Sequence, residues 1–267
     1  SAANIAAGLA IQGNSVDLMS PISNDSIGDF VINSCKKIGI NTLLLEKVSN
    51  LKNTLAIVDT MGDKTNAVLY RDKPADLFID ETFLKKVNLD SYLMIIVTGT
   101  SLSRNPSRNN VLKLMELAIK RKIEIVLDID YREGSWNDKK KAEKTLYSAS
   151  LLSNIIVGND LEFNFMSPDK NRGLSLASKL SKKNRITTIY KMGSKGLYYF
   201  DKNNKHFFKS FKVKSIKPTG AGDAFMSSFC SSKLRGVELS KSIKFGAAAG
   251  AIVVTRVGCS KAMPTLL

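Results

Sequence analysis

The second half of the chain alternates short hydrophobic runs with segments in which hydrophobic residues recur at helical spacing. Residues 92–97 are apolar throughout and precede Thr98-Gly99-Thr100. Such a run is typical of a strand buried on both faces of a parallel sheet. Further strands are predicted at 123–128, 154–157, 186–190 and 197–200. A helix is predicted after the first strand, with its apolar face formed by Val111, Leu112, Met115, Ala118 and Ile119.

This alternation predicts an α/β fold, a three-layer sandwich in which helices flank a mostly parallel central sheet. In such folds ligands bind outside the carboxyl ends of the strands. Segments 128–132, 158–162 and 192–196 each follow a predicted strand, so we expect them to line one edge of the sheet.

The first 72 residues have a different pattern. Helices are predicted at 4–12 and 29–38, and β-rich runs at 54–60 and 66–71 flank a Gly-Asp turn sequence at 62–63. We expect lid strands within about 12–22 and 54–72, forming a small sheet beside the main one. The whole of 1–267 is interpreted as a single domain.

Composition excludes several classes of protein. The chain has 267 residues, of which 43% are hydrophobic and 24% charged, which is typical of a globular protein and not of a disordered one. No stretch reaches the roughly 18 apolar residues of a membrane span, and there is no charged-then-apolar leader. The three cysteines have no metal-binding or redox spacing, so we expect a reducing, cytoplasmic location.

The net charge of +16 is unevenly distributed. Residues 1–70 carry −1 and the rest of the chain +17. A basic surface favours anionic partners, which include nucleic acid, a membrane surface and phosphorylated or carboxylated small molecules. The alternative is that scattered lysines simply solvate helix faces. His206 is the only histidine and has no Ser or Cys motif beside it, so we do not expect a catalytic triad.

The sharpest chemical feature is the segment 219–225, TGAGDAF. It follows a Lys-rich segment, 211–216, that is predicted to be a strand, and it opens a helix that runs to about Leu234, with Gly236 as its stop. Backbone N–H groups at a helix start form an anion site, and Asp223 in that site could accept a proton from an attacking hydroxyl. Phosphoryl transfer explains this combination; an ordinary glycine turn with an acidic N-terminus is the alternative.

With its surroundings, this segment resembles the C-terminal signature of the ribokinase/PfkB family of carbohydrate kinases. The resemblance covers nearly the whole chain. It includes Ala3-Asn4-Ile5-Ala6, the loop 23–28, the pair Asn159 and Glu162, and the turn Lys191 to Gly196. It implies a ribokinase-like fold and an ATP-dependent kinase that phosphorylates the primary hydroxyl of a sugar or keto-deoxy sugar acid.

A narrower set of motifs is similar to the branch of this family that phosphorylates 5-dehydro-2-deoxygluconate in myo-inositol breakdown. The motifs are at 70–77, 98–108, 128–136 and 258–265. Kinases of 2-keto-3-deoxygluconate and fructokinases share part of the set and are the alternatives. A polyanion-binding protein and a non-catalytic sugar sensor are more distant ones.

The chain departs from the family pattern at three places. It begins at Ser1 inside the sugar-binding motif, so we expect the first strand, with its substrate-binding Asp, to be missing from this sequence. Pro218 stands where many members have Asp, and Ala247 stands where some ribokinases have an adenine-contacting Asn.

The resemblance implies a role for each site residue. Asp223 is the expected base, with Gly220, Ala221 and Gly222 around the transferred phosphoryl group. ATP is assigned to Lys191, Gly193, Gly196, Asn159 and Ala247. Mg²⁺ is assigned to Asn159 and Glu162, through water. Substrate is assigned to Asn4, Arg132, Arg71 and Arg108. An ion pair of Arg132 with Asp130 or Glu133 is the alternative for that residue.

The implied cofactors are ATP and Mg²⁺, with a monovalent cation as a further candidate. The implied partners are ATP and a small sugar or sugar acid, without nucleic acid or membrane. Lid hairpins in this family often pair between subunits, and residues 56–58 and 67–69 are apolar enough for such a contact, so the resemblance also implies a homodimer through the lid.

Overall fold

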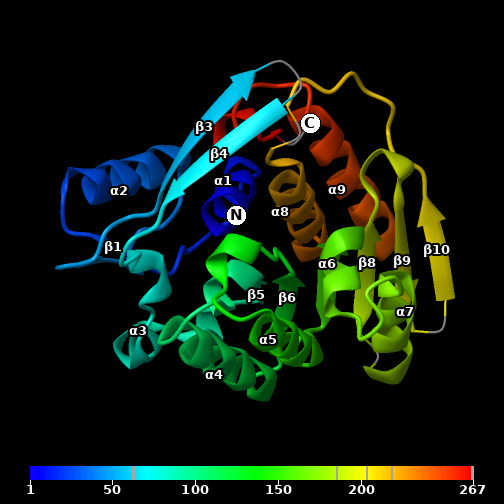
Figure 1. Ribbon diagram of the computed structural model, residues 1–267, viewed down its shortest axis with the longest axis horizontal. Coiled ribbons are helices and arrows are strands. Elements are labelled where there is room, and N and C mark those ends of the chain that lie inside the picture. The colour runs from blue at the N-terminus through cyan, green and yellow to red at the C-terminus, as the bar shows by residue number, and fades with distance from the viewer. Residues whose placement is uncertain (62–63, 185, 203, 218, 266–267) are drawn as a thin grey trace. The chain divides into compact units, whose positions relative to one another are not determined.

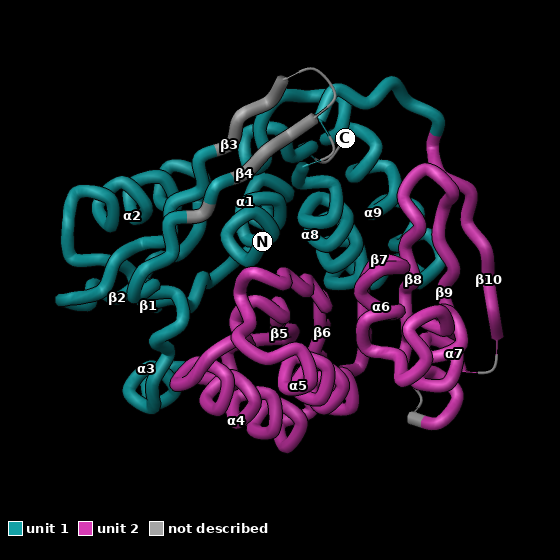
Figure 2. Tube along the Cα trace, in the orientation of Figure 1, with its two compact units in different colours: residues 1–87, 212–267 teal, residues 88–211 magenta. Residues whose placement is uncertain are grey.

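The computed structural model describes residues 1–61, 64–184, 186–202, 204–217 and 219–265. The chain forms two compact units, coloured separately in Figure 2. Unit 1 contains Ser1–Val87 and Lys212–Leu267, and unit 2 contains Asn88–Phe211. Unit 1 is therefore built from both ends of the chain, whereas unit 2 is one continuous segment.

Unit 2 is organised around a six-stranded sheet with the order β10-β9-β8-β7-β6-β5 (Figure 1). The strands β5 to β8 are parallel, and β9 and β10 are antiparallel additions at one edge. The bounds are β5 Met94–Thr98, β6 Glu124–Asp128, β7 Ile155–Asn159, β8 Thr187–Lys191, β9 Leu197–Asp201 and β10 Asn204–Phe208. The strands predicted at 92–97, 123–128, 154–157, 186–190 and 197–200 are confirmed to within two or three residues.

Helices connect the parallel strands of unit 2. They are α4 Ser107–Lys120, α5 Lys139–Leu151, α6 Asp160–Met166 and α7 Gly173–Asn184, with short 3-10 turns at Leu89–Ser91, Gly99–Leu102, Glu133–Ser135 and Gly193–Lys195. The central strands are completely buried: Ile125, Leu127 and Ile156 are all 0% exposed. Burial on both faces explains why these strands are continuous apolar runs in the sequence.

The core of unit 1 is a group of helices, α1 Ala2–Ile11, α8 Ala221–Leu234 and α9 Leu239–Val253. Polar contacts join the first two helices: the Gln12 side chain donates to Ser228 Oγ at 2.6 Å, and Asn14 donates to Ser231 Oγ at 2.9 Å. The remaining elements are α2 Ser26–Ile38, α3 Glu81–Lys86, the parallel pair β1 Ser20–Ser23 and β2 Leu45–Val48, the antiparallel pair β3 Leu55–Met61 and β4 Lys64–Tyr70, and 3-10 turns at Ala75–Leu77 and Ser260–Ala262.

The β-rich runs near residue 60 pair as expected, with Leu55 opposite Tyr70 and Ile57 opposite Val68. The predicted turn residues 62–63 lie outside the described residues. Within 12–22, the structure has the start of β1 and a single bridge between Asp17 and Asn41. The role of these strands as a lid stays a prediction.

One predicted element is wrong. Residues 211–216 form no strand; the strand in this region is β10, which ends at Phe208. The apolar residues that suggested a strand are instead exposed, Val213 by 46% and Ile216 by 59%. The backbone N–H of Ile216 donates to the carbonyl of Val254, at the end of α9, at 2.7 Å. The segment has the residue types of a strand, but in the structure it is held by this backbone hydrogen bond and not by pairing with a described strand. Across the described ranges, no helix is long and apolar enough to cross a bilayer.

Candidate active site

The turn that begins α8 presents backbone donors. Gly220 is the N-cap and has φ +91°, a left-handed conformation that favours glycine, and no side chain caps the helix. The first intrahelical bond here is from the N–H of Ala224 to the Gly220 carbonyl, at 2.9 Å. The N–H groups of Ala221, Gly222 and Asp223 precede that bond, so they have no acceptor inside the helix. The backbone donors expected at this turn are in place, and their binding of an anion stays a prediction.

Asp223 is held by a residue from the other end of the chain. The amide of Asn4, on α1, donates to Asp223 Oδ2 at 2.8 Å. The two residues are 219 positions apart in sequence. Asn4 was predicted to bind substrate, and the structure places its amide on the predicted base. An amide donor fixes the rotamer of the carboxylate and leaves its other oxygen, Oδ1, outside this bond.

Cys259 lies against the same turn. A Cβ added at Gly220 would meet Cys259 Sγ at 3.3 Å, so a side chain at position 220 would be crowded as well as strained. Burial raises the pKa of the Cys259 thiol, and the nearby Asp223 carboxylate raises it further. The group beside the anion-binding turn is therefore a neutral thiol, which adds no charge that would repel a phosphate. In the sequence Cys259 lies within the motif 258–265, but no role in the site was assigned to it.

In unit 2, Asn159 and Glu162 are joined at the start of α6. The Asn159 side chain accepts from the Glu162 N–H at 2.9 Å, and Glu162 Oε2 accepts from the Asn159 N–H at 2.7 Å. This is a reciprocal capping box. Asn159 and Glu162, whose spacing suggested a metal site, therefore stabilise the start of α6. This contact uses one oxygen of each side chain, Asn159 Oδ1 and Glu162 Oε2.

Glu162 is a buried carboxyl group in a basic neighbourhood. Burial raises its pKa, and this outweighs the opposing effects of Lys191 and of the Asn159 N–H; Asp130 raises the pKa further and Arg132 lowers it. β7 and β8 pair so that Asn159 is opposite Lys191. Four of the predicted residues, Asn159, Glu162, Lys191 and Arg132, are therefore brought together at the carboxyl edge of this sheet.

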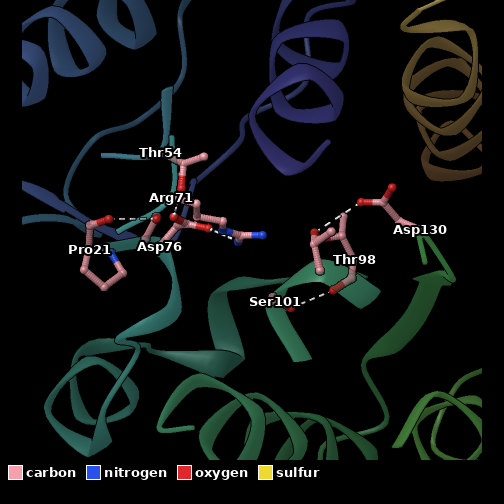
Figure 3. A network of polar contacts seen from close by, with 9 residues as sticks. Pro21, Thr54, Arg71, Asp76, Thr98, Ser101 and Asp130 are labelled. Carbon is pink, nitrogen blue, oxygen red and sulfur yellow. Dashed lines mark hydrogen bonds and ion pairs between the residues drawn. The ribbon is translucent and has the colours of Figure 1, made fainter. Parts of the chain in front are cut away.

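Asp130 lies in segment 128–132, which was expected to line the edge of the sheet, and it was named as an ion-pair partner in the alternative for Arg132. It follows β6, is 3% exposed, and has φ +33°, which is rare for a residue other than glycine. Its carboxylate accepts from Arg132 Nε at 2.9 Å and from Thr100 Oγ1 at 3.2 Å. Figure 3 shows this carboxylate directed toward the turn after β5, where Ser101 Oγ donates to the Thr98 carbonyl. Strained backbone beside buried charge is typical of functional sites.

The turn between β8 and β9 carries the predicted nucleotide-binding glycines. Gly193 and Gly196 both have positive φ, at +57° and +101°. A Cβ at Gly196 would approach the Phe208 carbonyl to 2.3 Å, whereas one at Gly193 would meet nothing within 4 Å. Gly196 is thus required by local packing, and Gly193 leaves open space over the turn.

The other predicted arginines are engaged elsewhere. Arg71 Nη2 pairs with Asp76 Oδ2 at 2.6 Å, and Thr54 donates to the same carboxylate (Figure 3). Arg108 donates to the carbonyls of Leu102 and Ser103. Burial lowers the pKa of Arg108.

Arg108 also lies over the ring of Trp136, with its guanidinium carbon 5.6 Å from the ring centroid. Trp136 is only 8% exposed, so its ring is packed in the interior of unit 2. Ala247 is half-buried on α9. Pro218 lies outside the described residues.

Residues 1–266 match the profile of the pfkB family of carbohydrate kinases. A 5-dehydro-2-deoxygluconokinase of Clostridium tetani is 33% identical over 269 residues, which cover 98% of this chain and 79% of that protein. A sugar kinase of Pyrococcus horikoshii, solved in complex with ATP, is 25% identical with a TM-score of 0.84 and covers 98% of this chain and 84% of its own.

The fold is also that of more distant structures. An aminoimidazole riboside kinase of Salmonella enterica, solved with aminoimidazole riboside and an ATP analogue, has a TM-score of 0.87 at 20% identity. The alignment covers 98% of this chain and 87% of that one. The predicted ribokinase-like fold is confirmed.

Proposed function

This chain belongs to the pfkB family of carbohydrate kinases, and we propose that within this family of ATP-dependent sugar kinases it phosphorylates 5-dehydro-2-deoxygluconate at the primary hydroxyl. The support for this substrate is the similarity to kinases of that name, which in the first case is 33% identity over 98% of this chain. The motif set 70–77, 98–108, 128–136 and 258–265 supports the same branch.

One observation carries the chemistry. Asp223, fixed by Asn4 at 2.8 Å, stands in the first turn of a helix whose leading N–H groups have no intrahelical acceptor. We assign to Asp223 the removal of the proton from the substrate hydroxyl as its oxygen bonds to the γ-phosphorus and the bond from phosphorus to the β,γ-bridging oxygen breaks. The N–H groups of Ala221 and Gly222 stabilise the charge on the transferred phosphoryl group. The products are the phosphorylated sugar acid and ADP.

The residues of unit 2 are assigned to the nucleotide and its metal. Lys191 supplies positive charge, and the turn at Gly193 and Gly196 admits a ligand close to the backbone. Mg²⁺ takes oxygen ligands and keeps several waters, so Asn159 and Glu162 suit it through water, with Glu162 Oε1 outside the capping box. No cluster of three acidic, His or Cys residues that could hold a metal directly occurs in the described part of the chain, which fits this water-mediated assignment. When bound, the metal offsets the negative charge of the phosphates.

We assign Arg132 to the substrate carboxylate or a phosphate. Its side chain is 65% exposed, while its partner Asp130 is buried and fixes Nε. A planar guanidinium can bind either anion with two hydrogen bonds.

A cytoplasmic location is also part of the proposal. The three cysteines, all within the described residues, form no disulfide.

The substrate assignment is tested by coupled ADP release with 5-dehydro-2-deoxygluconate, 2-keto-3-deoxygluconate and fructose at equal concentrations. We expect the highest kcat/KM with the first sugar acid. An equal or better value with either of the others would reassign the substrate. If none of the three compounds stimulates ADP release, all three substrate assignments are wrong. Repeating the assay with added K⁺ tests whether the enzyme needs a monovalent cation.

The base is tested separately. Asp223→Asn should lower kcat by about 10²–10⁴ because the amide cannot take the proton. ATP affinity, measured by equilibrium titration, should change little. Asp90→Asn removes a carboxylate from an exposed ion pair with Arg121 and is the matched control, with wild-type turnover expected. Near-normal turnover of Asp223→Asn would contradict the assignment.

A further inference from the structure

A groove on unit 2 lies between α5 and α7, and none of its lining residues belongs to the candidate active site. Its volume is about 660 Å³. The floor is formed by the buried side chains of Met166, Leu176 and Leu180, and Tyr147 and Pro168 complete the apolar lining. Mostly apolar cavities of 300–1,000 Å³ with a few polar groups are the usual sites for small molecules.

The rim of this groove is strongly basic. Lys144 comes from α5, and Lys179, Lys182 and Lys183 come from α7; all four are exposed. Glu143 is the only acidic residue among those that line the groove, and its Oε2 is paired with Lys170 Nζ at 2.6 Å. The four rim lysines therefore face no unpaired acidic group of the lining, and the groove has a positive potential.

The dimensions of the groove suit a small ligand better than a partner helix. On α7 it extends from Leu176 to Lys183, about 10 Å at 1.5 Å per residue. On α5 it involves little more than one turn. A helix docked in a groove is held by apolar anchors over i, i+3, i+4 and i+7, and it needs a longer apolar stripe than three buried side chains.

We propose that this groove binds a small organic anion that has an apolar or aromatic body and one acid group. The body lies on Leu176, Leu180 and Met166, and the acid group is held by Lys179 and Lys183. Those two lysines are four residues apart on α7, so they are neighbours on one side of the helix. The proposal rests on the shape and charge of unit 2 alone and does not depend on the substrate of the kinase.

The test uses 8-anilinonaphthalene-1-sulfonate, which has an aromatic body and one sulfonate. Its fluorescence is titrated with the full chain in saturating MgATP, so that the nucleotide site is occupied. We expect one saturable site per chain and competition by decanoate. Lys179→Glu with Lys183→Glu should weaken Kd at least tenfold. The control, Lys120→Glu with Lys122→Glu, makes the same charge change at exposed positions of unit 2 and should leave Kd within twofold.

Several results would overturn the proposal. One is an equal Kd for the variant Lys179→Glu with Lys183→Glu and for its control. The others are the absence of saturable binding and displacement of the bound probe by MgATP. An acidic amphipathic peptide of 14 residues that displaces the probe at lower concentration than decanoate would show a protein-binding groove instead. Circular dichroism checks that the variants fold. Lys179→Gln with Lys183→Gln, which removes charge without reversing it, should still weaken Kd at least threefold.

Discussion

At Glu162 the role in metal binding that we propose conflicts with the stability of the fold. Its carboxylate is buried, and the cost of removing that charge from water is larger than the attraction of Lys191 and Arg132. A buried charge that is incompletely compensated destabilises the folded state. In the wild type the Asn159 N–H donates to Glu162 Oε2 at 2.7 Å. The side-chain oxygen of a glutamine at position 162 could accept the same hydrogen bond without carrying a charge.

We therefore predict that Glu162→Gln raises the free energy of unfolding at pH 7 in EDTA and lowers kcat/KM by about 10–100-fold. The pKa of Glu162 is higher in the folded than in the unfolded protein, so wild-type stability falls as pH rises from the ordinary glutamate pKa, about 4.3, toward the raised value. The difference in unfolding free energy between the variant and the wild type should be absent below the ordinary glutamate pKa and reach its full size above the raised pKa. Urea unfolding at several pH values measures this, and lower stability of the variant at pH 7 would contradict it.

Residue-level reasoning from the sequence found most of the chemical groups. Of their partners it named Asp130, as the alternative for Arg132, but not the contacts made between distant parts of the chain. Asp223 and Glu162 were predicted from their motifs. The bond from Asn4 to Asp223 joins opposite ends of the chain, and no local pattern encodes such a contact. The strained backbone of Asp130 and the position of Cys259 beside Gly220 are likewise products of tertiary packing.

Helices α1 and α8 are in close contact at one glycine. A Cβ added at Gly8 would lie 2.3 Å from Ser227 Oγ and 2.5 Å from Ser227 Cβ. Ser227 is completely buried, so the helices would have to move apart. Asn4 is one turn before Gly8 on the same helix, and its bond to Asp223 depends on this spacing.

We predict that Gly8→Ala destabilises the fold by about 1–3 kcal/mol, as overpacking does, and lowers kcat more than it raises KM for ATP. Thermal unfolding and steady-state kinetics measure the two effects. Gly134→Ala is the matched control, because a Cβ there meets nothing within 4 Å. Wild-type stability and kcat in Gly8→Ala would show that the two helices can adjust freely.

The hairpin of β3 and β4 has an apolar outer face. Leu55, Ile57, Val68 and Tyr70 are 46%, 59%, 56% and 59% exposed, and the strand register places them in two directly opposite pairs. The side chains of residues 58–67 and 69, which include part of the apolar sequence that first suggested a dimer, lie outside those described. Exposed apolar patches of this kind favour contact with a partner.

We predict that this face mediates a homodimer. Ile57→Glu with Val68→Lys removes the central pair and puts opposite charges across the strands, so the hairpin itself is retained. Sedimentation velocity should show at least a tenfold weaker dimer. Leu43→Glu with Leu93→Lys, at isolated residues that are 81% and 79% exposed, is the control. A wild-type protein that stays monomeric at 100 µM would rule out the dimer.

Element-level prediction succeeded where a segment is buried and regular. The strands of the parallel sheet and α8, with Gly236 at φ +74° after its end, were placed within a few residues. It failed at 211–216, where apolar residues alternate with lysines but no neighbouring strand is available. Alternation indicates that a segment could pair, and only the tertiary structure decides whether a partner exists.

At the scale of the whole molecule, the two units are connected near Val87 and Phe211. Around the second connection, residues 209–217 form no helix or strand, and Lys209, Lys212 and Lys214 are exposed. Exposed irregular segments are preferred sites of proteolysis. A cut here would leave α8 and α9 packed on α1, because both pieces belong to unit 1.

We predict that brief trypsin treatment cuts between 209 and 214. The two pieces should separate on a denaturing gel and elute together on native gel filtration. Changing the three lysines to Gln should slow this cut at least tenfold. Fragments that separate under native conditions would show that the contacts between α1 and α8 do not hold unit 1 together.

The discontinuous build of unit 1 also sets an order of events during synthesis. Residues 88–211 are continuous and can fold once they leave the ribosome. The bond between Asn4 and Asp223 must wait for the 219 residues that separate them, about 10–40 s at 5–20 residues per second. If Asp223 is the base, as proposed above, we predict that the nascent chain turns over ATP only after its C-terminal helices are made.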